Sequence, residues 1–182
     1  MRIVLVLALL AATAVAQDNV SLMSAEAACG PAKISFSATA DATQHPVPQP
    51  EPDKALVFVI EDLGQCSDCF HGHFIASDVS SAVVKFGVDG SWVGADRGSS
   101  YLFFSLTPGE HHMCINWQSR LSIRSHAFAM ASLAAEAGKV YYFRARVFPG
   151  ENNFSFDLDR VDTDEGKFLV AASPYSVSHS KK

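Results

Sequence analysis

Residues 83–117 (VVKFGVDGSWVGADRGSSYLFFSLTPGEHHMCINW) constrain the fold of this chain more than any other stretch. Short apolar or alternating runs are separated there by turn signals. Asp89-Gly90 suits a two-residue turn, because glycine accepts a positive φ without a Cβ clash. Arg97–Ser100 is a polar break, and Pro108-Gly109 fits the centre of a type II turn. The stretch therefore predicts a β-meander.

Side-chain alternation gives each strand of this meander one apolar face. The residues expected to face the core are Val84, Phe86, Val88, Leu102, Phe104, Leu106, Met113, Ile115 and Trp117. Those expected on the opposite side of the last strand are His112, Cys114 and Asn116. We expect the adjacent His111 and His112 to form a solvated pair at a strand end.

Further strands are predicted on both sides of the meander. They cover Lys33–Thr39, Lys54–Glu61, Phe128–Ala135, Lys139–Phe148 and Asn153–Asp159. The run Lys54–Glu61 (KALVFVIE) is apolar on both faces, which is typical of a buried central strand. After the last strand, Asp162–Ala172 reads as a short helix in which Asp162 is the N-cap and Glu165 completes a capping box. Its apolar stripe is predicted to contain Phe168, Leu169 and Ala172.

These elements predict a mainly β protein, a single antiparallel β-sandwich of about seven or eight strands with one short C-terminal helix. The sandwich domain is assigned to residues 54–172. Residues 17–53 are an N-terminal extended arm, in which four prolines at every second position from 46 to 52 favour polyproline II. Residues 173–182 are predicted to be a disordered tail.

Residues 1–16 have the features of a signal peptide. Arg2 precedes the apolar run Ile3–Leu10, and Ala14-Val15-Ala16 matches a cleavage site that leaves Gln17 as the first mature residue. We therefore expect an exported protein, periplasmic or extracellular. No other segment is long and apolar enough for a transmembrane helix. The formal net charge of −5 and the absence of a long basic run make nucleic acid a poor partner.

Four cysteines in an exported chain allow three disulfide pairings. We expect Cys29–Cys114 together with Cys66–Cys69. Because Cys114 is predicted to point away from the core and Cys29 belongs to the arm, their disulfide would hold the arm across the outer face of the meander.

The segment from Cys66 to His73 allows three interpretations. Cys66, Cys69, His71 and His73 have ligand types suited to zinc or copper, although their spacing matches no standard zinc finger. Cys66 and Cys69 also form a C-x-x-C pair, which can carry redox chemistry. A local disulfide is the interpretation that we adopt, and metal binding is its alternative.

A basic and aromatic stripe is predicted on the outer side of the strand Lys139–Phe148. Tyr142, Arg144 and Arg146 alternate there with apolar residues. An anion or a glycan would fit such a stripe. We prefer the simpler interpretation, in which the two arginines form ion pairs with Asp157 and Asp159 on the neighbouring strand.

Several segments resemble a known family. The step from Val84 to Gly94 and the turn Pro108–His111 resemble PEGA-type surface modules, which are β-sandwiches related to transthyretin-like domains. Residues 55–59, 98–111 and 137–142 are more similar to an uncharacterised domain family of bacterial exported and envelope proteins. The resemblance implies a β-sandwich at the cell envelope. It supplies no catalytic residues, because that family has no established activity.

No catalytic signature, such as a nucleophile elbow or a zinc-protease motif, occurs in the chain. We therefore expect a non-enzymatic exported module that has a structural or binding role and needs no cofactor. Its partner would be another envelope protein or a glycan. The alternative is a metal-binding envelope protein that uses the Cys66–His73 segment.

Overall fold

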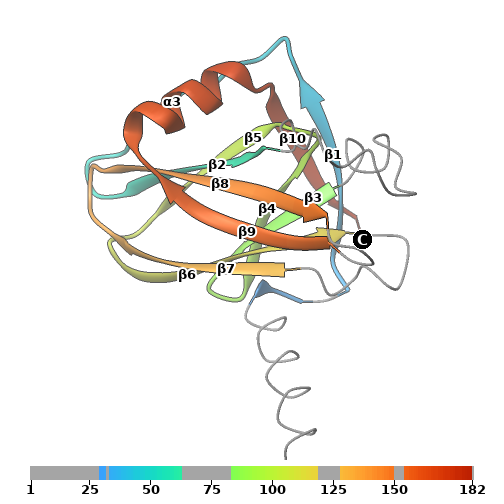
Figure 1. Ribbon diagram of the computed structural model, residues 1–182. Coiled ribbons are helices and arrows are strands. Elements are labelled where there is room, and N and C mark those ends of the chain that lie inside the picture. The colour runs from blue at the N-terminus through green and yellow to red at the C-terminus, as the bar shows by residue number, and fades with distance from the viewer. Residues whose placement is uncertain (1–28, 32, 63–82, 119–127, 150–153, 182) are drawn as a thin grey trace, which may run out of the picture.

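The computed structural model describes residues 29–31, 33–62, 83–118, 128–149 and 154–181. These residues form ten strands and one helix, arranged as two facing sheets with the helix on the outer face of the larger sheet (Figure 1). The elements are β1 (Ser35–Asp41), β2 (Ala55–Glu61), β3 (Val83–Val88), β4 (Ser91–Arg97), β5 (Tyr101–Leu106), β6 (Gly109–Gln118), β7 (Phe128–Ala135), β8 (Val140–Pro149), β9 (Phe154–Val161), α3 (Thr163–Ala172) and β10 (Tyr175–Lys181).

The larger sheet has six strands in the order β1-β10-β5-β2-β8-β9, and the smaller sheet has four in the order β4-β3-β6-β7. The smaller sheet is antiparallel throughout. In the larger sheet, however, β2 runs parallel to β8, and β10 runs parallel to β5 over a single residue pair. Between β2 and β8 the chain forms the four strands of the smaller sheet and β5 of the larger one, so β8 returns parallel to β2 after a long crossover.

The mainly β class with one C-terminal helix is confirmed, but the strand count and the purely antiparallel topology are wrong. The structure has ten strands, and its larger sheet is mixed. Two strands are additional to the predicted set. β4 (SWVGADR) contains a glycine and two charged residues, and β10 (YSVSHSK) is mainly polar, so neither shows a strong apolar alternation.

The prediction of a disordered tail at residues 173–182 is wrong for Tyr175–Lys181. This segment is β10, which pairs along its whole length with β1. The hydroxyl of Ser176 also donates to the carbonyl of Ala95 at 2.9 Å, and Ala95 N–H donates to the hydroxyl of Ser178 at 3.1 Å. These bonds fix β10 to β4 of the other sheet. The folded unit therefore includes β1 and β10 and exceeds the predicted bounds of 54–172.

The main core lies between the two sheets. It combines alternate residues of β2 with the inward residues predicted for the meander, and it extends to β7, β8 and β9. Its buried members are Ala55, Val57, Val59, Val84, Phe86, Val88, Leu102, Met113, Ile115, Leu133, Ala135, Tyr141, Phe143, Ala145 and Leu158. Each large apolar side chain buried in this way contributes about 1.5–3 kcal/mol of transfer free energy.

The helix α3 covers the other face of the larger sheet. Asp162 is its N-cap, as predicted, and accepts hydrogen bonds from the N–H groups of Asp164 and Glu165 at 2.9 Å. The predicted apolar stripe is wrong in part, because Phe168 is 70% exposed and the buried residues are Gly166 and Val170. The helix approaches so closely at Gly166 that a Cβ there would lie 2.1 Å from the Tyr142 ring.

Candidate functional site

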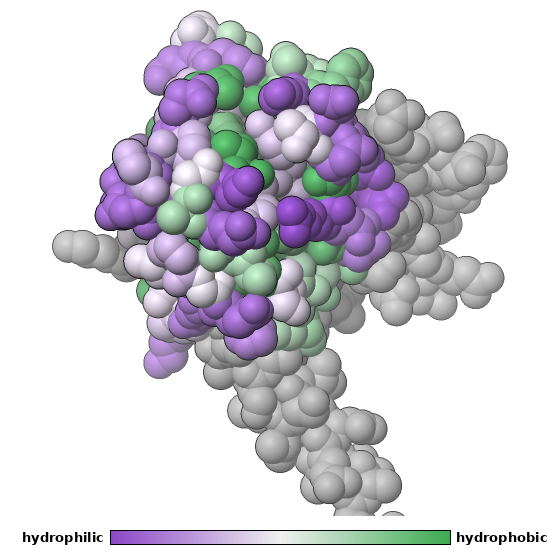
Figure 2. Space-filling view, turned by 90° about the vertical axis from the view of Figure 1, so that its left-hand side faces the viewer, coloured by the Kyte–Doolittle hydropathy of each residue, from purple (hydrophilic) through white to green (hydrophobic). Residues whose placement is uncertain are grey.

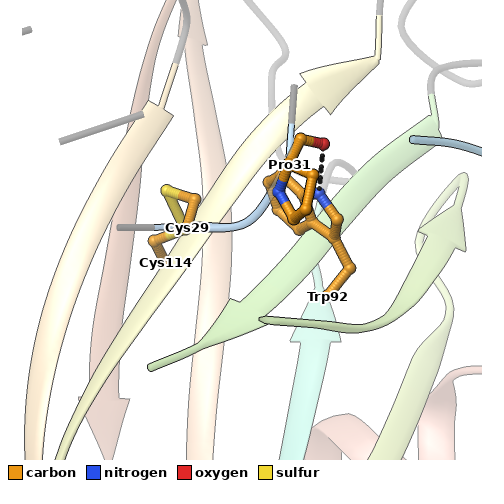
Figure 3. The surroundings of a disulfide bond; sticks show 4 residues. All are labelled: Cys29, Pro31, Trp92 and Cys114. Carbon is orange, nitrogen blue, oxygen red and sulfur yellow. Dashed lines mark hydrogen bonds between the residues drawn. A yellow bond between two sulfur atoms is a disulfide. The ribbon is translucent and has the colours of Figure 1, made fainter. Parts of the chain in front are cut away.

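The disulfide expected between Cys29 and Cys114 is present, with the two Cα atoms 5.5 Å apart (Figure 3). Cys114 lies on the face of β6 opposite the core residues Met113 and Ile115, as predicted. It is nevertheless buried, because the segment that begins at Cys29 covers this face. The outer side of the smaller sheet is therefore a covered surface, and the disulfide anchors its cover.

The cover lies in direct contact with the sheet at two points. The indole Nε1 of Trp92, on β4, donates to the carbonyl of Pro31 at 3.0 Å (Figure 3). On β3, Gly87 leaves the space that the arm occupies, because a Cβ at this position would lie 2.1 Å from the carbonyl oxygen of Cys29. The hydrogen bond from Trp92 and the close approach at Gly87 thus fix the first described residues of the arm.

Side chains of the smaller sheet then bind the backbone of the arm as it approaches and enters β1. Gln118 does so twice, since its amide oxygen accepts from Phe36 N–H at 2.5 Å and its amide nitrogen donates to Phe36 C=O at 2.7 Å. The ammonium of Lys85 donates to the carbonyl of Ile34 at 3.2 Å and lies 4.2 Å from the centre of the Trp92 ring. β1 is an edge strand, so the backbone N–H and C=O of Phe36 on its open side have no neighbouring strand to bond. The side chain of Gln118 bonds both groups instead.

The proline-rich segment also lies along the domain. The hydroxyl of Tyr101 donates to the carbonyl of Pro46 at 2.9 Å, and the ring of His45 packs edge-on against Tyr101. Pro46, Pro48 and Pro50 are half-buried, whereas the residues between them are exposed. Residues 45–52 thus form a ridge beside Tyr101, which we call the proline ridge.

A second polar region lies inside the sandwich. Glu61 ends β2 on the side of Ala55, Val57 and Val59, which face the main core. Asp96 on β4 is paired with Val84, another residue of the main core, and directly paired residues point to the same side of a sheet. Both carboxyl side chains therefore enter the space between the sheets, and both residues are 0% exposed.

These two carboxyls have no hydrogen-bond partner. All four of their oxygens are buried and unbonded. The backbone N–H of Gly98 and the hydroxyl of Ser176 lie nearby, outside hydrogen-bonding geometry. Burial raises the pKa of Glu61 to about 8. Burial and the neighbouring Glu61 carboxyl raise the pKa of Asp96 well above its usual range. The two carboxyls are thus close enough to repel each other in their ionised forms.

The turn next to the acid pair is held by its own polar contacts. The hydroxyl of Ser100 accepts from Arg97 N–H and donates to Arg97 C=O, both at 3.2 Å. The carbonyl of Ser100 accepts from Glu61 N–H at 2.9 Å. These bonds fix the backbone around both acids, so the carboxyls belong to a rigid frame.

His111 is a third polar feature, and the expectation of a solvated strand-end pair is wrong for it. Its ring is buried, with Nδ1 at 2.7 Å from the Asp89 carboxylate and Nε2 at 2.8 Å from the Thr107 carbonyl. Both partners only accept hydrogen bonds, so the arrangement is satisfied fully by the doubly protonated ring. The Asp89 carboxylate accordingly raises the pKa of His111, against the effect of burial.

The arginine stripe forms ion pairs, but in a different pattern from the one expected. Arg146 contacts both Asp157 and Asp159. Arg144 instead contacts Glu165 of α3, and its Nε lies 3.9 Å from Asp62. The stripe therefore links the sheet to the helix.

Cys66, Cys69, His71 and His73 lie outside the described residues, so their disulfide and their metal binding both stay predictions. Within the described ranges, no group of three or more His, Cys, Asp or Glu is placed to hold a metal ion.

No sequence motif marks the acid pair. Its one available signal was the position of Glu61, which follows the inward alternation of Ala55, Val57 and Val59 into the core. Asp96 lay in a segment that was not assigned as a strand, so its side could not be assigned either.

Comparison with protein-family models, with curated proteins and with solved structures found no match. In the part of the chain that the structure describes, no helix has the length and the apolar character needed to cross a membrane.

Proposed function

We propose that the protein is an exported, non-enzymatic β-sandwich module with a structural or binding role at the cell envelope. The observation that carries the proposal is the buried Cys29–Cys114 disulfide. Disulfides persist in oxidising compartments and are rare in the cytosol. This one joins the arm to the sheet, so an oxidising environment stabilises the folded protein. The signal-like residues 1–16 and the resemblance to envelope domains support the same role.

The interior supports a non-enzymatic role. Apolar side chains fill the space between the sheets, and the acid pair within it is fully buried. A general acid or base has to reach a proton of its substrate within hydrogen-bonding distance. Glu61 and Asp96 do not have that access, so we do not assign a catalytic role to them.

The proline ridge supports a binding role. Its Val47 is 51% exposed, although the prolines beside it pack on the domain. An extended proline-rich segment that is already ordered loses little conformational entropy when another protein binds to it. On the face shown in Figure 2, hydrophilic and hydrophobic residues are interspersed.

Export is tested by expressing the full chain and fractionating the cells. We expect the protein outside the cytoplasm, beginning at Gln17, with Cys29 and Cys114 resistant to alkylation until a reductant is added. The variant Leu7→Arg, which interrupts the apolar run, should stay in the cytoplasm and serves as the control. Unprocessed wild-type protein in the cytoplasm with reactive Cys29 and Cys114 would contradict the proposal.

The binding role is tested by crosslinking within that compartment. A partner bound at the proline ridge should be captured by the wild-type protein and by Gln49→Ala, but lost in Val47→Asp. Equal capture by both variants would leave a structural role as the better description.

A further inference from the structure

The buried acid pair presents an unusual set of atoms. Glu61 and Asp96 are both 0% exposed, and none of their four carboxyl oxygens has a hydrogen-bond partner. Buried polar groups in proteins are nearly always hydrogen-bonded, because an unpaired one costs about 1–3 kcal/mol. Four buried acceptor oxygens without a donor therefore require a physical explanation.

Protein cations do not supply it within the described residues. Arg144 points to the opposite face of the larger sheet, where it contacts Glu165. Lys85 lies on the covered outer face of the smaller sheet, where it donates to Ile34 C=O. Arg97, although adjacent to Asp96 in sequence, is exposed. None of these three side chains forms an ion pair with either acid.

A shared proton is the first way to keep such a pair buried. It would join the two carboxyls by a short O–H···O hydrogen bond of about 2.5–2.7 Å. A proton shared in this way neutralises only one of the two charges, so a buried charge of −1 would remain without a partner.

A bound cation is the second way. A divalent metal ion between the two carboxylates is bound by their oxygens and neutralises both charges. The donors are all oxygen, with the hydroxyl of Ser176 close to Asp96. Oxygen donors select hard cations such as Ca²⁺ and Mg²⁺, which complete their shells with hydroxyl or carbonyl oxygens and water. A charge of +2 balances the two carboxylates.

We propose that Glu61 and Asp96 form a binding site for a hard divalent cation, Ca²⁺ or Mg²⁺, within the sandwich. The cation links the end of β2 in the larger sheet to β4 in the smaller one. This site goes beyond the proposed function and is separate from the predicted Cys66–His73 site, whose sulfur and nitrogen donors suit zinc or copper.

The test is a thermal unfolding experiment on the purified exported protein at pH 8 after chelation and dialysis. We expect saturating CaCl₂ or MgCl₂ to raise Tm by about 5 °C, the size of shift that tight binding produces in a domain of this length. Glu61→Gln and Asp96→Asn should each remove the shift. Glu136→Gln changes an exposed glutamate and should keep it.

A second measurement applies even if the two acid variants do not fold. Equilibrium dialysis of the wild-type protein with calcium or magnesium, followed by elemental analysis, should give about one bound ion per chain, as two carboxylates suffice for one divalent charge. The proposal is overturned if neither ion binds or raises Tm. It is also overturned if the acid variants keep the shift. Since these measurements use purified protein, their outcome is independent of whether the protein is exported.

Discussion

The covered outer face of the smaller sheet and the acid pair between the sheets both bury polar groups, but they do so in opposite ways. On the covered face, Trp92, Lys85 and Gln118 each bond to a backbone carbonyl or N–H of the arm. Between the sheets, the Glu61 and Asp96 oxygens have no such partner. Matched polar groups thus hold the arm on the smaller sheet, whereas the acid pair has no such partner and fits our proposal of a bound cation. Substitutions at polar contacts should therefore destabilise the protein, whereas a divalent cation at the acid pair should stabilise it.

The largest effect is expected from the disulfide. Replacing Cys29 and Cys114 by serine should lower the free energy of unfolding by about 4 kcal/mol, because the crosslink closes a long loop in the unfolded chain. Urea denaturation measures this loss. Limited proteolysis should then cut the arm first. If the arm of the serine variant stays as protected as in the wild type, the polar contacts alone are enough to hold it.

The next effect concerns the close approach of the arm to β3. Gly87→Ala should destabilise the protein by about 2 kcal/mol, since the added methyl group overlaps the backbone carbonyl of Cys29. Gly94→Ala on β4 is the control, because the nearest atoms there belong to the flexible Leu102 side chain at 3.1 Å. Thermal unfolding of both variants checks the order. Equal effects would mean that the arm can move away from β3 at little cost.

A smaller effect is expected at the edge of β1. Gln118→Ala removes two hydrogen bonds to Phe36 and should cost about 1–2 kcal/mol. Gln49→Ala, at an exposed position of the proline ridge, should cost almost nothing. Hydrogen exchange of Phe36 N–H is the more specific measurement, and it should accelerate only in the Gln118 variant. An unchanged rate would show that Gln118 does not protect this edge.

The smallest effect is a pH dependence at His111, a buried titratable group that is fully partnered. Its pKa is raised above the value of 6.5, chiefly by Asp89, with Glu110 adding to the effect. Its stabilising contribution should thus be complete below pH 6.5 and be lost as the pH rises through the folded pKa. His112, the neighbouring histidine, is exposed.

Asp89→Asn should lower the His111 pKa measured by NMR and remove about 1 kcal/mol of stability at pH 6, the usual net value of one hydrogen bond. The two proteins should converge in stability at high pH. A constant difference across the pH range would show that His111 is not the group responsible.

The alternation of apolar side chains was sufficient to predict most of the strands. It placed Phe86, Ile115 and their neighbours in the core and put Cys114 on the opposite side of β6, where the disulfide forms. The capping signal at Asp162 likewise located the start of α3. These features are local, so a periodic pattern or a single cap is enough to reveal them.

Features that depend on tertiary contacts were not predictable in the same way. β10 is polar because its serines bond to β4, and a polar C-terminal segment reads as a tail without that partner. The exposure of Phe168 follows from the packing of Gly166 on Tyr142, which turns α3 away from the expected side. The meeting of Glu61 and Asp96 requires the pairing of β4 with β3, which placed Asp96 beside Val84.

The pairing of β1 with β10 joins the first and last strands of the described chain, and this has a consequence for the order of folding. β1 cannot pair until β10 has been synthesised, and closing so long a loop slows folding. The Cys29–Cys114 disulfide shortens the covalent path between these two strands, because β1 follows Cys29 directly. Formation of the disulfide before β10 docks would therefore speed the pairing of β1 with β10. In a reduced chain this pairing would be slower.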